Sequence, residues 1–182
     1  MTEYGILHES EVGFDAGHGR SPGGTGRLFP DATLPSMNSG ELHLDSFRPD
    51  WNLVILLLGD GELTDRCARL LDQLADLRAE LEMEEARVVV ISARTREEWV
   101  GKWSYPFTLA FDGGGRVHQR VAAADSSGRP EVALCITDRY REIFAMTRPG
   151  DEQWPARGAQ VIDWLTFVNI QCPECSAPEA WS

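Results

Sequence analysis

Apolar residues along the chain form two strand patterns with a helical pattern between them. Residues 53–58 are a continuous apolar run, which is typical of a strand covered on both faces. After a break at 59–61, the spacing of apolar residues predicts an amphipathic helix over 64–81, with a stripe made of Cys67, Leu70, Leu71, Leu74, Leu77 and Leu81. Residues 87–92 form a second apolar run. Together these segments predict a strand–helix–strand unit with parallel strands.

The remaining patterns complete an α/β fold of thioredoxin type, with a mixed central sheet and helices on both faces. An extended piece at 29–35 and a turn at 38–41 precede the first strand. The later segments predict, in order, a helix at 95–103, an extended segment at 105–111, a turn at 112–115, a helix at 117–124, a loop at 125–130, a strand at 132–137, its hairpin partner at 142–146, and a helix at 161–170.

The length of 182 residues predicts one domain of ordinary size. We expect an irregular N-terminal extension at 1–27, the thioredoxin-like domain at 28–170, and a C-terminal tail at 171–182. His8 and His18 in the extension are expected to be exposed polar residues rather than metal ligands.

Charge and hydropathy narrow the range of partners and compartments. The net charge of −12 and the absence of a basic stretch argue against nucleic-acid binding. No apolar window is long enough to span a membrane, so we expect no membrane partner. The N-terminus lacks the basic start and apolar core of a secretory signal, which favours a cytoplasmic location.

Cys67 is the first candidate for chemistry. It lies on the first turn of the predicted helix, where free backbone N–H groups and the helix dipole favour an anion, and Arg66 is adjacent. Both effects lower the pKa of a thiol, and the thiolate is the nucleophile. Because Cys67 also lies on the apolar stripe of the helix, its position is equally compatible with a plain core residue.

The tail carries a second candidate, the C-x-x-C pair formed by Cys172 and Cys175. This pair could be a redox dithiol, half of a zinc site that needs further ligands, or a feature without chemistry. Trp181 suggests that the tail packs on its own subunit or on a neighbour, so a homodimer is among the expected assemblies. Cys135 lies in the middle of a predicted strand and is expected to be buried and inert.

Several segments resemble, in order and spacing, the peroxiredoxins of the alkyl hydroperoxide reductase / thiol-specific antioxidant (AhpC/TSA) family. The similar segments are 29–34, 40–47, the strand 54–58, 105–112 and 132–138. The family places a Pro-x-x-x-Thr-x-x-Cys motif after that strand, and Thr64 and Cys67 match it. The resemblance runs from about residue 27 to residue 170 and covers most of the chain.

The resemblance implies a thiol-dependent peroxidase. Cys67 would attack the peroxide oxygen and become a sulfenic acid, with Thr64 as its hydrogen-bonding partner. Cys172 or Cys175 would act as the resolving thiol, and an external dithiol such as a thioredoxin-type protein would reduce the disulfide. The substrate would be a hydroperoxide, and no organic cofactor would be required.

Two positions differ from the family pattern. Asp60 stands where the motif has proline, and a carboxylate close to the thiol would raise its pKa. The family's arginine falls at Val132, so Arg66 and Arg129 are the candidate cations near the thiolate. Two alternatives therefore stay open: a thiol–disulfide oxidoreductase acting through the two tail cysteines, and a non-catalytic binding or sensing module with zinc on the tail.

Overall fold

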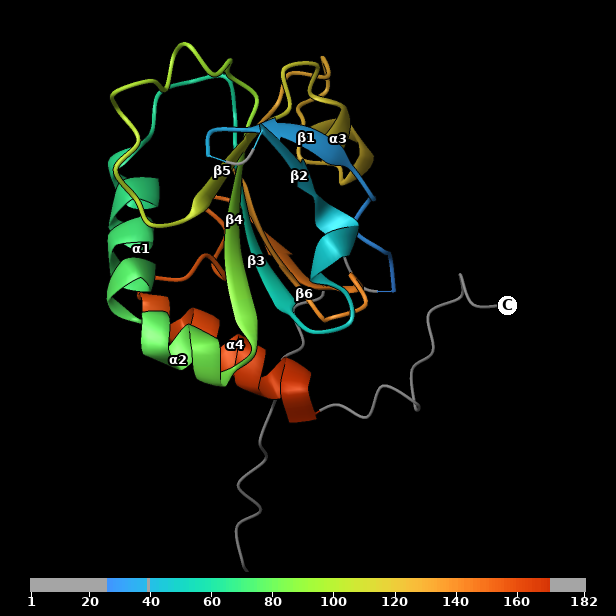
Figure 1. Cartoon of the computed structure of the whole chain (residues 1–182), viewed down its shortest axis with the longest axis vertical. Helices are drawn as coiled ribbons and strands as arrows, with labels where there is room; N and C mark the ends of the chain where they lie inside the picture. Colours follow the sequence, from blue (N-terminus) through green and yellow to red (C-terminus); the bar gives the residue numbers. More distant parts are fainter. Residues whose placement is uncertain (1–25, 39, 171–182) are drawn as a thin grey trace, which may run out of the picture.

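The computed structural model describes residues 26–38 and 40–170, and its centre is a seven-stranded mixed sheet (Figure 1). The strands lie in the order β2-β1-β5-β4-β3-β6-β7. Their bounds are β1 (Thr33–Ser36), β2 (Gly40–His43), β3 (Asn52–Leu58), β4 (Ala86–Ser92), β5 (Thr108–Phe111), β6 (Ala133–Thr137) and β7 (Ile143–Thr147). The β3–β4 and β4–β5 pairs are parallel, while β6 pairs with β3 and β7 antiparallel. The predicted mixed α/β sheet is confirmed.

Layers of apolar side chains cover both faces of the sheet. Along β3 the side chains alternate: Val54, Leu56 and Leu58 belong to one apolar cluster, and the residues between them belong to the other. The first cluster includes α1 (Asp65–Asp76), α2 (Arg78–Met83) and α4 (Gly158–Ile170). The second includes α3 (Arg116–Arg120), the β1–β2 hairpin and the short 3-10 helix η1 (Leu44–Phe47). In Figure 1, α1, α2 and α4 lie at the left and bottom of the view and α3 lies at the upper right, so the two groups of helices cover different faces of the sheet.

The four predicted helices all differ from the structure, three of them as follows. The helix predicted at 64–81 is two helices, because the backbone leaves helical geometry at Leu77 (φ −94°, ψ 27°). The segment 95–103 forms hydrogen-bonded turns rather than a helix. Glu98 does accept the Thr95 N–H at 2.9 Å, but Gly101 takes a φ of +75°, which ends the helical path. The helix predicted at 117–124 is α3, and Ala122 just after it has a φ of +61°.

The hairpin of β1 and β2 was missed, because the extended piece at 29–35 and the turn at 38–41 did not predict a pair of strands. Both strands are only four residues long, and β1 contains Pro35, which cannot donate to a ladder. Helix α4 begins at Gly158, three residues before the prediction. The Gly158 N–H donates to the Gln73 side chain at 2.7 Å, so the start of α4 is tied directly to α1.

Candidate functional site

Cys67 lies where the sequence predicts it, on the first turn of α1 after the interior strand β3. Thr64 is the N-cap residue of α1, with extended backbone angles (φ −75°, ψ 152°). Its hydroxyl oxygen accepts the backbone N–H of Cys67 at 3.3 Å. An N-cap residue and its acceptor oxygen satisfy one of the free N–H groups of the helix start. Thr64 and Cys67 therefore form one local unit, fixed by the spacing between them.

The environment of the thiol differs from the sequence expectation. Cys67 has 0% relative exposure and belongs to the apolar cluster between the sheet and α1. Burial raises the pKa of the Cys67 thiol, because the thiolate is poorly solvated there. The Thr64 hydroxyl and the charge of Arg66 both lower this pKa but do not outweigh burial. The expectation that the helix start would give a lowered thiol pKa is therefore wrong for this conformation.

Asp60 and Arg129 bind each other. The Arg129 Nε donates to both carboxylate oxygens of Asp60, at 3.0 and 2.7 Å, and both side chains are exposed. The hydrogen bond from Arg129 lowers the pKa of Asp60. The proposed effect of Asp60 on the thiol is not the cause of the raised pKa, which comes from burial. Of the two candidate cations, Arg66 is the one whose charge acts on Cys67.

Val132 supplies no charge at the position of the family's arginine. It is half-buried and packs against the same apolar cluster that contains Cys67. The loop before it comes close to the turn after β3, since a Cβ added at Gly59 would lie 2.7 Å from the carbonyl oxygen of Pro130. The 129–130 segment thus adjoins the strand–helix turn, although its arginine is three residues away from the family position.

A buried histidine bonded to the end of β3 was missed by the sequence analysis. The His118 ring is fully buried, with Nε2 at 3.0 Å from the carbonyl oxygen of Leu58 and Nδ1 at 2.8 Å from Asp112 Oδ2. Asp112 also accepts the backbone N–H groups of Arg116, Val117 and His118 at 3.0, 2.9 and 3.2 Å. Burial by itself would raise the pKa of Asp112, but these hydrogen bonds hold it below its usual value. The network connects the β5–α3 loop to the strand that precedes Cys67.

No sequence signal reveals this network. Asp112 begins a glycine-rich stretch that predicts a turn, and the partner of the His118 ring is a backbone carbonyl 60 residues away. Backbone partners of this kind carry no side-chain signature.

The other candidate residues are placed as follows. Cys135 is fully buried in β6, and burial raises its pKa to about 12, which confirms a buried thiol. Cys172, Cys175, His8 and His18 lie outside the described residues.

Within residues 26–38 and 40–170, no group of three or more His, Cys, Asp or Glu side chains could hold a metal ion. Over the same residues, no helix has the length and apolar character needed to cross a membrane.

Solved structures share this fold over nearly their whole length. AhpC of Mycobacterium tuberculosis matches with a TM-score of 0.65 and 15% identity, over 83% of this chain and 97% of that one. The mitochondrial 2-Cys peroxiredoxin of Plasmodium falciparum matches with a TM-score of 0.67 and 12% identity, over 80% and 94%. A structure from Chlorobium tepidum, described as a thiol:disulfide interchange protein DsbE, matches with a TM-score of 0.58 and 18% identity, over 78% and 97%. The TM-scores show that the thioredoxin-like fold is shared, and at such low identities the matches show the fold alone.

Sequence comparison supplies the family. No curated protein is significantly similar to this chain. The model of the AhpC/TSA family, in contrast, matches residues 25–163, which include β3, the turn and Cys67. This match and the fold support a peroxiredoxin-like redox function. With most of its length matched, the chain belongs to the AhpC/TSA family.

Proposed function

We propose that the protein is a thiol-dependent peroxidase that reduces hydroperoxides through Cys67. The observation that carries the proposal is the placement of Cys67 within the first turn of α1, at the carboxyl end of strand β3, with Thr64 capping the same turn. Membership of the AhpC/TSA family supports the assignment of redox chemistry to this cysteine. The charge of Arg66 also favours the thiolate.

In the proposed reaction, the Cys67 thiolate attacks one oxygen of the hydroperoxide. An S–O bond forms, the O–O bond breaks, and the second oxygen leaves as the alcohol after taking up a proton. Cys67 becomes a sulfenic acid, oxidised by two electrons. A second thiol, for which Cys172 and Cys175 are the candidates, then forms a disulfide with release of water. An external dithiol, such as a thioredoxin-type protein, restores both thiols, which suits a cytoplasmic location.

Burial of the thiol adds a step to this reaction. A peroxide cannot reach a side chain with 0% exposure, so we propose that the turn before α1 opens to admit it. The turn is suited to opening, because Asp60, Gly61, Glu62 and Thr64 are all exposed. Opening at this point would separate the exposed Asp60–Arg129 pair and the Thr64–Cys67 hydrogen bond.

The proposal is tested by following hydroperoxide consumption with dithiothreitol as the reductant. We expect the Cys67→Ala variant to lose turnover. The matched control is Cys135→Ala, which removes a second fully buried thiol, on strand β6, and should leave turnover intact. Equal turnover in Cys67→Ala and the unaltered protein would refute the peroxidase assignment.

A second assay, which follows reduction of a disulfide substrate, separates the alternative based on the tail. If Cys172→Ala and Cys175→Ala together abolish reduction of a disulfide substrate while Cys67→Ala does not, the protein acts as a thiol–disulfide oxidoreductase through the C-x-x-C pair. With dithiothreitol present, the peroxidase reading predicts that the two tail variants keep hydroperoxide turnover, because the external dithiol can resolve the sulfenic acid directly.

A second candidate function, a non-catalytic redoxin-fold binding or sensing module, is favoured by one observation. The thiol is fully buried and its pKa is raised, which opposes thiolate formation. If hydroperoxide leaves Cys67 unmodified in a mass-spectrometric thiol assay, this second function accounts for the structure better. A zinc content of the purified chain that depends on Cys172 and Cys175 would then assign the metal to the tail.

A further inference from the structure

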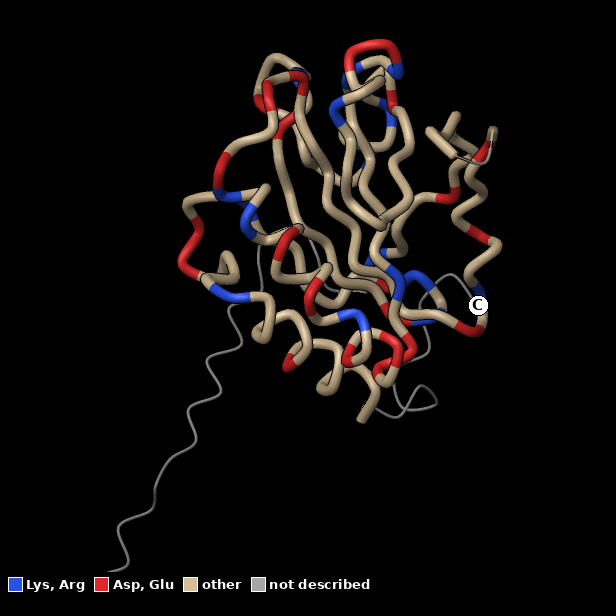
Figure 2. Tube along the Cα trace, turned by 60° about the vertical axis from the view of Figure 1, so that its left-hand side comes forward, with Lys and Arg blue, Asp and Glu red and all other residues tan. Residues whose placement is uncertain are grey.

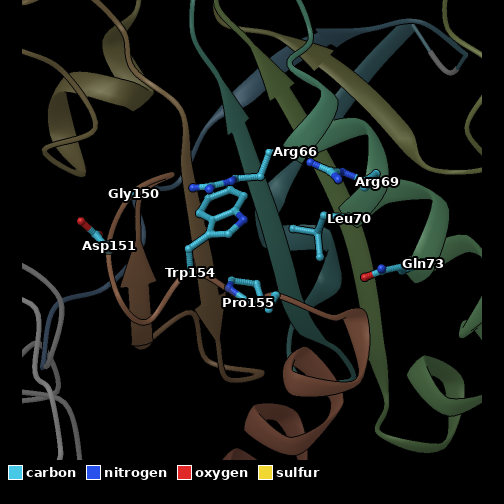
Figure 3. Close-up of a pocket in the computed structure, with 9 residues that line it drawn as sticks. Arg66, Arg69, Leu70, Gln73, Gly150, Asp151, Trp154 and Pro155 are labelled. Carbon is cyan, nitrogen blue, oxygen red and sulfur yellow. The ribbon is translucent and has the colours of Figure 1, made fainter.

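A groove lies between the outer face of α1 and the loop that joins β7 to α4 (Figure 3). Its volume is about 420 Å³. Pockets of roughly 300 to 1,000 Å³ are the usual size of small-molecule sites. Cys67 is not among the residues that line the groove, although its neighbour Arg66 is. The groove is therefore separate from the buried thiol but shares the first turn of α1 with it.

The floor of the groove is apolar and held in place from both sides. Leu70 from α1 and Trp154 from the loop are 2% and 7% exposed, and Pro155 is buried beside them. The loop is fixed by Asp151, whose backbone carbonyl accepts the Trp154 N–H at 3.1 Å. At the far end, the bond from the Gly158 N–H to the side chain of Gln73 ties the loop's exit to α1. The site is therefore formed before any ligand arrives.

The rim of the groove is cationic. Arg66 and Arg69 reach from α1 towards the loop that carries Trp154 (Figure 3). Within the described ranges neither arginine forms a salt bridge, and the Arg69 Nε donates to the backbone carbonyl of Asp65 at 3.2 Å. Asp151 is the acid in the lining. Its carboxylate points away from the groove in Figure 3 and accepts the Arg148 N–H at 2.6 Å.

The positive charge at the rim of the groove is opposite in sign to the net charge of the chain. The chain has a net charge of −12, and Asp and Glu positions occupy the upper loops as well as the lower helices in Figure 2. Two arginines that form no salt bridge with any carboxylate of the described residues lie above an apolar floor, and this arrangement matches one chemical class, an anion attached to an apolar body. Arginine pairs with carboxylates through two parallel hydrogen bonds, and indole faces favour flat apolar groups.

We propose that this groove binds an organic carboxylate, with its carboxylate at Arg66 and Arg69 and its apolar body against Trp154 and Leu70. The volume of about 420 Å³ lies near the lower end of the usual range for small-molecule sites, which suits a compact organic acid. A compact aryl-alkanoate fits this volume better than a long-chain lipid. Because the groove lies outside the thiol site, the binding does not depend on the proposed peroxidase activity.

The proposal is tested by isothermal titration calorimetry with 4-phenylbutyrate as the probe. Two matched compounds isolate the two parts of the site: 4-phenylbutanamide keeps the apolar body without the charge, and acetate keeps the charge without the body. We expect saturable binding of 4-phenylbutyrate, with both reference compounds at least roughly tenfold weaker, the usual effect of losing one charged hydrogen bond or one buried apolar group.

A pair of arginine variants locates the binding. Arg69→Gln should weaken 4-phenylbutyrate roughly tenfold, whereas Arg116→Gln, on α3 beyond the opposite face of the sheet, should leave it unchanged. Arg69 is preferred to Arg66 because the charge of Arg66 also acts on the Cys67 thiol. The proposal is overturned if no saturable binding occurs, if the amide binds as tightly as the acid, or if the two arginine variants behave alike. Binding that persists in Cys67→Ala separates this result from the peroxidase test.

Discussion

The substitution Asp112→Asn tests whether the buried His118–Asp112 network stabilises the strand that leads to Cys67. The carboxylate of Asp112 is 5% exposed and accepts four hydrogen bonds, from three backbone N–H groups and from the His118 ring. An asparagine has one acceptor oxygen, so its amide nitrogen would face N–H groups that need an acceptor. The His118 ring would also lose the charge that it faces.

The expected cost follows from this geometry. A buried donor left without its acceptor typically costs about 1 to 3 kcal/mol, and the donors that still meet the amide oxygen lose a hydrogen bond to a charged group. A domain of this size is usually stable by about 5 to 15 kcal/mol, so the variant should still fold but unfold much more easily. We expect a free energy of unfolding lower by at least about 1 to 3 kcal/mol for Asp112→Asn.

Urea unfolding followed by circular dichroism measures this change as a shift of the midpoint at constant slope. The control is Asp125→Asn. Asp125 also accepts backbone N–H groups, from Ser127 at 2.8 Å and Arg129 at 3.0 Å, but it is exposed, so water replaces the lost contacts. A change for Asp112→Asn no larger than that for Asp125→Asn would refute the reasoning.

The pH dependence gives an independent check of the same pair. The pKa of Asp112 is lowered in the folded chain, so the folded state holds the ionised form more tightly than the unfolded state does. Its contribution is present above the unfolded pKa of about 4 and is lost as the pH falls through the lower folded pKa. The difference in stability between the unaltered protein and Asp112→Asn should therefore shrink in acid below about pH 4.

Two further predictions concern the turn and the thiol. Because burial raises the pKa of Cys67, its alkylation rate, followed by mass spectrometry, should still rise with pH above the pH range in which ordinary thiols ionise. Arg66→Gln should shift this pH profile to higher pH, because the charge of Arg66 lowers the pKa of the thiol. A plateau of the rate near neutral pH would contradict the raised pKa. In Gly59→Ala, the added Cβ would lie 2.7 Å from the carbonyl oxygen of Pro130 and should cost about 1 to 3 kcal/mol of stability by thermal unfolding. Gly61→Ala, with nothing within 4 Å, is the matched control, and equal losses in the two variants would argue against this close approach.

The sequence predicts those parts of the fold that depend on neighbours close in the chain. The apolar run at 53–58 and the stripe from Cys67 to Leu74 correspond to β3 and α1, because burial of one helical face or of a whole strand requires such a pattern. It does not predict the β1–β2 hairpin, whose four-residue strands are too short to show a period. The segment 95–103 was misassigned because its capping box is real but its continuation is stopped at Gly101.

The features of the candidate site also fall into two groups, those that local sequence predicts and those that depend on the tertiary structure. Position and helix geometry of Cys67 follow from local spacing, and the cap at Thr64 is visible three residues before it. The protonation chemistry of the thiol does not follow, because the sign of its pKa shift depends on how completely the sheet and helix cover the sulfur. The Asp60–Arg129 pair joins residues 69 positions apart, so neither residue alone indicates the other.

The sequence by itself determined the strand–turn–helix that carries Cys67, since hydrophobic periodicity and capping act over a few residues. Tertiary structure alone decided what surrounds that unit: the burial that raises the thiol pKa, the His118–Asp112 network behind β3, and the arginine-rimmed groove beside Trp154. Solvation and charge pairing are set by every group that packs within a few ångströms, and those groups come from segments far apart along the chain.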